Sequence, residues 1–296
     1  AVAGAVLSCG LIPVLVDVDE NFALDTTKIP DNAERAIVAH MEGYVGNIPN
    51  VKFCIEDCAQ AMGARHPDGR YAGTVGSAGV YSFHHAKVLT SGEGGLVVTN
   101  RPEIHGYIRG YHDHGASRKH GEYPVWKDQA YFGENMVAGE AQTSIQLQQL
   151  AYLDEITNGL ERGYQILKDV VPESDKYEIL KRKTYDQKIS LRLLFNDVAL
   201  QKKAVQIFKE HGLPHWTFDR YFLPDHPILR DKQSLYADGF PWSLVPEPES
   251  LWSRDSFAKT KDRIDRTLCL PVSPEQSEDM QFQEAMAYKK ALELVR

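Results

Sequence analysis

The chain has 296 residues, of which 43% are hydrophobic and 25% are charged, and its formal net charge is −8. These values are typical of a globular protein with two domains or one large one. The acidic balance gives no support to a nucleic-acid or acidic-membrane partner, and no apolar run reaches the ~20 residues of a membrane span. Four scattered cysteines fit free thiols in a reducing compartment such as the cytoplasm.

The first residue is Ala1, and the sequence begins within an apolar segment and not at the start of a recognisable element. Residues 1–8 have the composition of a helix end, and Gly10 is a typical stop signal. Neither a basic leader nor a cleavage site indicates a signal peptide. We therefore expect the N-terminal portion of a longer protein to be absent from this chain.

Short apolar runs alternate with helical stretches through the first half of the chain. Their hydrophobicity is continuous rather than alternating, which favours a sheet covered on both faces, as in α/β folds. The expected strands are Val14–Val18, Ala36–His40, Val51–Ile55, Val80–Phe83 and Leu96–Thr99.

The second half begins with apolar residues at helical spacing over 138–171, where Gly159 and Gly163 predict a bend or break. A new composition starts near residue 172. It predicts a strand at 189–195, a helix at 197–211, and a last helix to residue 294 that opens at Ser273 or Ser277. The aromatic tract 215–252 predicts packed irregular structure, because its large rings need burial.

Lys87 lies in a short loop between two apolar runs, five residues after Ser82 and ahead of the glycine-rich segment 91–95. A loop lysine is most often a solvated surface charge. Against apolar strands, however, its ammonium is disfavoured, and the free amine becomes available for imine chemistry.

Asp57 closes another apolar run, at the strand end where open α/β sheets bind ligands. A helix cap is the alternative role. Together Lys87 and Asp57 suit pyridoxal phosphate (PLP), which needs an amine for its Schiff base and an anion that keeps its ring nitrogen protonated.

Several histidines invite a metal hypothesis, but adjacent strand residues such as His84 and His85 point to opposite faces, so we predict no metal site. A role beside a sugar substrate is an alternative to packing for His84, His85 and His112. Trp216, with Asp219 and Arg220, could line a sugar pocket, although core packing in a small domain is the competing interpretation. The full histidine set is His84, His85, His112, His114 and His120.

The segments IEDCAQA and SFHHAKVLTSGEGG resemble the signature of the DegT/DnrJ/EryC1/StrS family of PLP-dependent sugar aminotransferases. Further segments (PVLVDVD, GENMVAGEAQTSIQLQQLAYLDE, LCLPVSPEQSED) follow in the family's order, so the resemblance covers nearly all of the chain. It implies an α/β fold of the aspartate-aminotransferase type (PLP fold type I). A large domain with a mixed sheet would span 1–150, and a smaller α+β domain would span 151–296.

The resemblance also implies residue roles. Lys87 would be the Schiff-base lysine and general acid–base, Asp57 would pair with the pyridine nitrogen, and Gln60 would bind the ring hydroxyl. Ser82 would bind the cofactor phosphate, and Asn135 would reach the phosphate of the neighbouring subunit's cofactor. A homodimer with a shared site follows from that last role.

Three departures from the family pattern stand out. The Ser-Gly-Thr phosphate loop would lie upstream of Ala1, the segment 40–55 has room for hardly any helix, and Val137 stands where an arginine is usual. HDHG at 112–115 and SFAKTKDRIDRTLCLPV are similar to the subgroup that makes 8-amino-3,8-dideoxy-octulosonate.

We predict transfer of an amino group from glutamate or glutamine to a keto- or aldehydo-sugar, in amino-sugar or lipopolysaccharide biosynthesis. A sugar dehydratase of the same fold is one alternative, although such members replace the lysine with histidine. An inactive dimerising remnant is the other.

Overall fold

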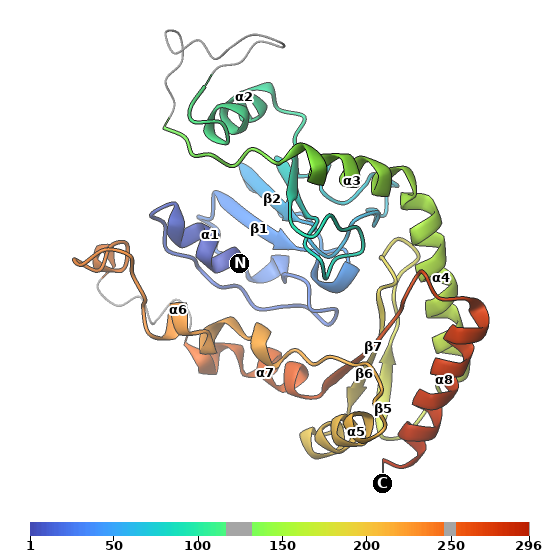
Figure 1. Ribbon diagram of the computed structural model, residues 1–296. Coiled ribbons are helices and arrows are strands. Elements are labelled where there is room, and N and C mark those ends of the chain that lie inside the picture. Colours follow the sequence, from blue (N-terminus) through green and yellow to red (C-terminus); the bar gives the residue numbers. More distant parts are fainter. Residues whose placement is uncertain (117–131, 246–252, 296) are drawn as a thin grey trace. The chain divides into compact units, whose positions relative to one another are not determined.

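A computed structural model describes residues 1–116, 132–245 and 253–295 (Figure 1). The chain forms two compact units. The first comprises Ala1–Ile29, Gly159–Arg182 and Lys188–Arg296, and the second comprises Pro30–Asn158 and Lys183–Gln187. The N-terminal residues thus group with the C-terminal part of the chain. The domain division at residue 150 stays a prediction.

The second unit contains a four-stranded sheet in the order β1-β2-β3-β4, of which β1 and β2 are labelled in Figure 1. Its first three strands are parallel, and β4 runs antiparallel to β3, so the sheet is mixed. The four strands that the sequence predicted within this unit are confirmed, with ends displaced by one or two residues. Their bounds are Arg35–Ala39 (β1), Phe53–Asp57 (β2), Ala78–Ser82 (β3) and Gly95–Val98 (β4).

Helices of this unit are α2 (Pro102–Tyr111), α3 (Glu140–Ala151) and the first part of α4 (Leu153–Val170). The predicted break in the 138–171 stretch exists, but it lies at Tyr152 and not at the glycines. Gly159 and Gly163 are buried inside α4. A Cβ on either would press on the segment around Pro274 and Val272, so both serve close packing and not a bend.

The first unit begins with α1 (Val2–Ser8), as predicted. The expected strand Val14–Val18 is wrong, because only Val18 makes an isolated bridge, to Leu24. An apolar run becomes a strand only where a neighbouring strand pairs with its backbone.

An antiparallel sheet β5-β6-β7 organises the core of this unit. Every residue of its central strand β6 is buried, and the sheet packs with α4, α5 and α8 in one hydrophobic cluster. The strands are Tyr177–Leu180 (β5), Ser190–Phe195 (β6) and Thr267–Pro271 (β7). The helices are α5 (Val198–Glu210), α6 (Pro227–Arg230), α7 (Ala258–Asp265) and α8 (Glu278–Glu293).

Two predictions from the sequence concern this unit: the start of the last helix and the burial of the aromatic tract. Ser277 caps α8 by accepting a hydrogen bond from the Met280 amide, so the helix opens at the later of the two candidate serines. The aromatic tract buries Phe218, Phe222 and Trp242, whereas Tyr236 is exposed, against expectation. Trp252 lies outside the described residues.

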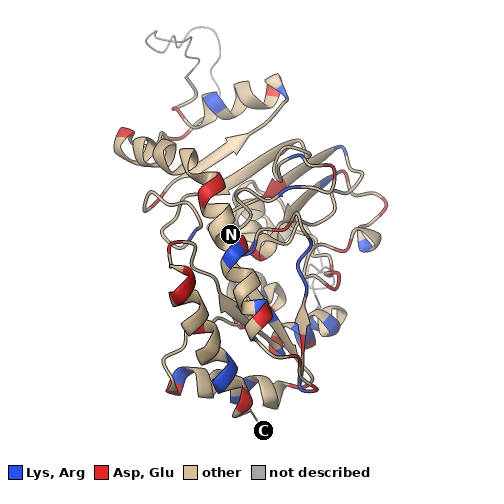
Figure 2. Ribbon diagram, turned by 90° about the vertical axis from the view of Figure 1, so that its right-hand side faces the viewer, with Lys and Arg blue, Asp and Glu red and all other residues tan. Residues whose placement is uncertain are grey.

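No helix among the described residues is long and apolar enough to cross a membrane. Basic and acidic residues are interspersed along the described ribbon (Figure 2).

Two glycines allow a direct test of close packing. A Cβ on Gly79 in β3 would overlap the Gly73 carbonyl oxygen, whereas a Cβ on Gly106 in α2 would meet nothing within 4 Å. We expect Gly79→Ala to lower the free energy of unfolding by about 1–3 kcal/mol, because backbone cannot move aside cheaply. Gly106→Ala should raise it by up to about 1 kcal/mol through helix propensity. Urea denaturation measures both, and equal effects would contradict the packing described.

Candidate active site

The site is built at the carboxyl end of β2, where Asp57 is the last strand residue. Its Oδ1 accepts a hydrogen bond from the Ala59 amide at 3.0 Å, which fixes the side chain in a turn. Gln60 follows, and its Oε1 accepts from the Glu42 amide at 2.9 Å. This contact orients the Gln60 amide so that its NH₂ group is the end left to serve as a donor.

Lys87 lies in a loop between β3 and β4 that continues directly from Ser82. The Ser82 Oγ accepts from the His84 amide at 3.3 Å, and the Lys87 amide donates to the His84 carbonyl at 2.9 Å. Ser82, Lys87, Asp57 and Gln60 are all half-buried. The adjacency of β2 and β3 therefore brings the ends that carry Asp57 and Ser82 side by side.

Lys87 has the electrostatic character expected of an imine-forming lysine. Burial lowers the pKa of its ammonium below 10.5, and the negative charge of Asp57 acts in the opposite direction without cancelling the effect. The charge of Asp57 thus reaches Lys87, which places the amine and the carboxylate in one electrostatic environment. A lowered pKa increases the fraction of free amine at neutral pH.

His84 and His85 lie beside Lys87 in this loop and not in a strand, so the expectation that their side chains point to opposite faces is wrong: their ring centroids are 3.9 Å apart. The His84 Nδ1 accepts from the Ala86 amide at 3.2 Å, and its Nε2 lies 3.8 Å from a Glu93 oxygen. His84 is half-buried and His85 is exposed. The two imidazoles could contact a substrate next to Lys87, and their substrate role stays a prediction.

Asn135 and His112 come together in a second part of this unit. Asn135 bridges Asp113, and the His112 carbonyl accepts from the Met136 amide at 2.8 Å. The His112 ring uses Nδ1 against the Arg109 carbonyl at 2.7 Å, which ties it to the end of α2. Asn135 is exposed, and neither predicted role is tested by this geometry.

Trp216 belongs to the first unit, where it is half-buried and pairs with Cys269 of β7. It lines a groove of about 810 Å³ together with residues of α5 and α7. Asp219 lies on the same groove. The predicted sugar contact of Trp216 stays a prediction.

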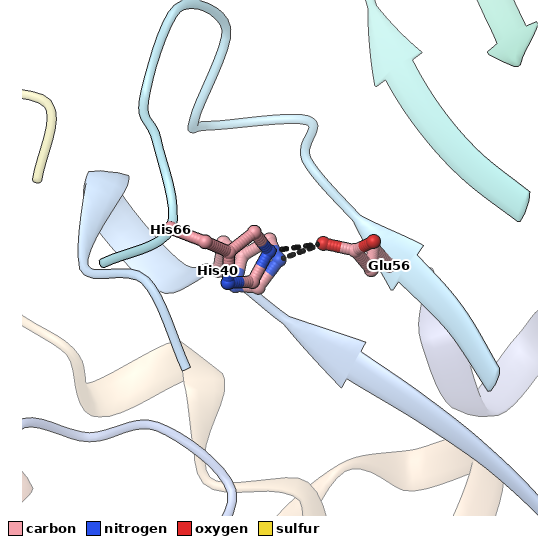
Figure 3. A group of neighbouring side chains, drawn as sticks. All are labelled: His40, Glu56 and His66. Atoms are coloured by element: carbon pink, nitrogen blue, oxygen red, sulfur yellow. Dashed lines mark hydrogen bonds and ion pairs between the residues drawn. The ribbon is translucent and has the colours of Figure 1, made fainter. Parts of the chain in front are cut away.

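A buried cluster that sequence reasoning missed lies directly behind the site. Glu56 precedes Asp57 on β2 and points to the opposite face, where His40 Nε2 lies 3.0 Å and His66 Nε2 lies 2.8 Å from its Oε2 (Figure 3). The amides of Gly73, Val75 and Gly76 also donate to this carboxylate, at 2.5–2.8 Å. The signal available in the sequence was an acidic residue at an inward position of a buried strand, which requires partners.

The donor atoms of this cluster match a zinc site, but the hydrogen-bond directions do not. The Gly46 amide donates to His40 Nδ1 at 3.0 Å, so the ring proton is on Nε2, which has no lone pair for a metal. A metal-bound histidine donates from its other nitrogen instead. The geometry describes an ionised carboxylate that collects hydrogen bonds.

Those hydrogen bonds control the charge of Glu56. Burial alone would raise its pKa, but donors from His40, His66 and the Gly76 and Gly73 amides outweigh burial and hold the pKa far below 4.5. The carboxylate is therefore ionised in the folded protein. It ties the loop 66–76 and the segment after β1 to the strand that carries Asp57.

Glu56→Gln should lower the free energy of unfolding at pH 7 by about 3 kcal/mol, because the amide cannot accept from all these donors. The folded pKa is depressed, so the stabilisation is complete above pH 4.5 and is lost as the pH falls below it. The gap between wild type and variant should therefore shrink between pH 7 and about pH 3. Urea denaturation across this range is the measurement.

The control is Glu34→Gln, because Glu34 is exposed and pairs only with exposed Lys52 among the described contacts. Its effect should stay within about 0.5 kcal/mol. If the Glu56 variant were as stable as this control, the assignment of Glu56 as an ionised carboxylate that accepts several hydrogen bonds would be contradicted.

The chain belongs to the DegT/DnrJ/EryC1/StrS aminotransferase family, whose model matches residues 1–283. Pyridoxal phosphate is the cofactor of this family. The solved structure of Helicobacter pylori PseC, an aminotransferase of pseudoaminic acid biosynthesis, superposes with a TM-score of 0.79 at 17% identity. The match covers 98% of this chain and 76% of that one. The predicted fold class, PLP fold type I with a mixed sheet, is confirmed.

Two curated enzymes are similar to this chain in sequence. L-glutamine:2-deoxy-scyllo-inosose aminotransferase from Streptoalloteichus tenebrarius is 30% identical over 191 residues, which cover 58% of this chain and 45% of that enzyme. GDP-perosamine synthase from Escherichia coli O157:H7 is 28% identical over 259 residues, covering 78% of this chain and 68% of that enzyme. The chain thus spans less than half the length of the first relative.

Proposed function

We propose that this chain carries the catalytic lysine of a PLP-dependent aminotransferase that moves an amino group onto a sugar. The observation that supports this most directly is Lys87, a half-buried lysine with a lowered pKa that shares its environment with Asp57. Membership of the family supports the same conclusion.

The residues present fit the cofactor. Asp57 offers a carboxylate with one oxygen already fixed by Ala59, Gln60 offers an oriented donor, and Ser82 offers a hydroxyl at the end of β3. These match an aromatic nitrogen, a ring hydroxyl and a phosphate, respectively. When bound, the cofactor supplies an electron sink for the bond that is cleaved next to the amine.

In this proposal the chain's own groups bind, orient and move protons. Asp57 would keep a proton on the ring nitrogen, because its negative charge would stabilise the pyridinium form. Gln60 would donate to the ring hydroxyl. Lys87 would hold the cofactor through its amine. As a free amine, its Nζ would take the proton from the donor's α-carbon and would later deliver a proton to the acceptor carbon that receives the amino group.

The proposed acceptor is a keto- or aldehydo-sugar, and the proposed donor is glutamine or glutamate. The names of the relatives support this class, since one acts on scyllo-inosose and another makes GDP-perosamine. His84 and His85 beside Lys87 could meet sugar hydroxyls. The octulosonate subgroup, the lipopolysaccharide pathway and a cytoplasmic location stay predictions.

A homodimer is part of the proposal. Large apolar side chains flank Asn135 on the surface of the second unit: Phe132 is 82% exposed, Met136 56% and Val137 53%. Such a patch supports contact with a second copy, which would bring Asn135 to the neighbouring site. Val137, in place of the usual arginine, would make this contact apolar.

Lys87→Ala should abolish the band near ~410–430 nm that PLP acquires when it binds a lysine covalently. Borohydride reduction of the wild type, followed by peptide mass analysis, should locate the cofactor on the peptide containing residue 87. Lys52→Ala is the control, since that lysine is exposed in the same unit. A band that survives in the Lys87 variant would overturn the assignment.

Asp57→Asn keeps the shape and the acceptor for the Ala59 amide but removes the negative charge. We expect the cofactor band to form, while the rate at which glutamate or glutamine bleaches it falls roughly 10²–10³-fold, because the pyridinium form is no longer stabilised. Stopped-flow absorbance measures this half-reaction. An unchanged rate would show that Asp57 only caps the turn.

A further inference from the structure

The segment from Phe83 to Gly94, here called the lysine loop, carries Lys87, and backbone hydrogen bonds join the two ends of this loop. The Phe83 amide donates to the Gly94 carbonyl at 2.9 Å, and the Ser91 amide donates to the Phe83 carbonyl at 3.0 Å. Phe83 and Leu89 are fully buried in one cluster with Met62. The base of the loop is therefore a packed structure from which Lys87 extends.

Helix α3 contacts this base through two glutamines one turn apart. Gln149 Oε1 accepts from the Thr90 amide at 3.2 Å. Gln146 Nε2 donates to Ser91 Oγ at 2.9 Å, and that hydroxyl donates to the Glu93 carbonyl at 2.7 Å. Residues three apart on a helix share a face, so one side of α3 provides both contacts.

The fit between loop and helix is close at Gly94. Its φ is 144°, and a Cβ there would overlap the Gln146 side-chain nitrogen. Gln146 is only 7% exposed, so its amide needs a protein partner, and Ser91 supplies one. Leu150 of the same helix packs against the cluster of Phe83 and Leu89 and anchors α3 there.

We propose that Gln146 and Gln149 are positioning residues that hold the lysine loop and thereby set the place of Lys87 relative to Asp57. This inference rests on the proposed function. The two amides act through opposite ends, since Gln149 uses its oxygen as an acceptor and Gln146 uses its nitrogen as a donor. If the two side chains only filled space, the order of the loop would not depend on whether each side chain offers a donor or an acceptor.

Glutamate separates these cases, because it has the size of glutamine but no N–H donor. Gln149→Glu keeps the acceptor for Thr90, whereas Gln146→Glu loses the donor to Ser91. Gln149→Leu removes the acceptor at similar size. Gln148→Glu is the control, because Gln148 is exposed on the same helix.

The first measurement is amide hydrogen exchange in the full chain without added cofactor. We expect roughly tenfold faster exchange of the Thr90 amide in Gln149→Leu, because the acceptor of that amide is removed. We expect a similar increase for the hydrogen-bonded amides of Ser91 and Gly92 in Gln146→Glu, because this part of the loop loses its side-chain hydrogen bond to α3 and opens more readily. Gln149→Glu and Gln148→Glu should stay within about twofold of wild type. If the amides of the lysine loop exchanged at equal rates in the Gln146→Glu and Gln149→Glu variants, the proposal that the two glutamines hold this loop would be overturned.

The second measurement is the pH midpoint of the absorbance of the PLP-loaded protein, which reports on the surroundings of Lys87. It should shift in Gln146→Glu and Gln149→Leu and not in Gln148→Glu. Faster exchange without this shift would leave the glutamines a structural role and overturn the positioning claim. If the wild type forms no cofactor band, the proposed function is refuted, and with it the positioning of Lys87 for chemistry. Hydrogen exchange would still decide whether the two glutamines hold the lysine loop.

Discussion

The buried carboxylate of Glu56 is the interaction on which the candidate site depends. Two histidine rings and three backbone amides donate to it, so one side chain joins β2, the segment after β1 and the loop before β3. Asp57, the next residue, projects to the opposite face because strand side chains alternate. The strand thus bears a buried structural carboxylate on one face and, on the other, the carboxylate that we propose for the chemistry.

Close backbone approaches complete this arrangement. Gly79 of β3 lies against Gly73, and the Tyr81 hydroxyl donates to the Ala72 carbonyl at 2.6 Å. The loop held by Glu56 therefore also packs on the strand that ends at Ser82. Stability of the sheet and placement of the candidate site depend on the same contacts, so a change around the two histidines would also affect the position of Asp57.

Lys87 is supported differently from Asp57. Its loop is fixed at the base by backbone hydrogen bonds and by helix α3, while its tip carries the two histidines and remains accessible. This division suits the two roles that we propose for Lys87, which are to hold a cofactor and to transfer a proton.

The sequence by itself determined the strands of the second unit, the lysine and carboxylate at their ends, and the family, because these depend on local hydrophobic runs and on short motifs. The tertiary structure decided what depends on distant partners. Val14–Val18 is no strand because, among the described residues, only Val18 makes a bridge, and Gly159 and Gly163 pack against a remote segment instead of bending their helix. The ring of donors around Glu56 and the glutamines at the lysine loop come from residues 10 to 59 positions away, and no local pattern encodes which of them will meet.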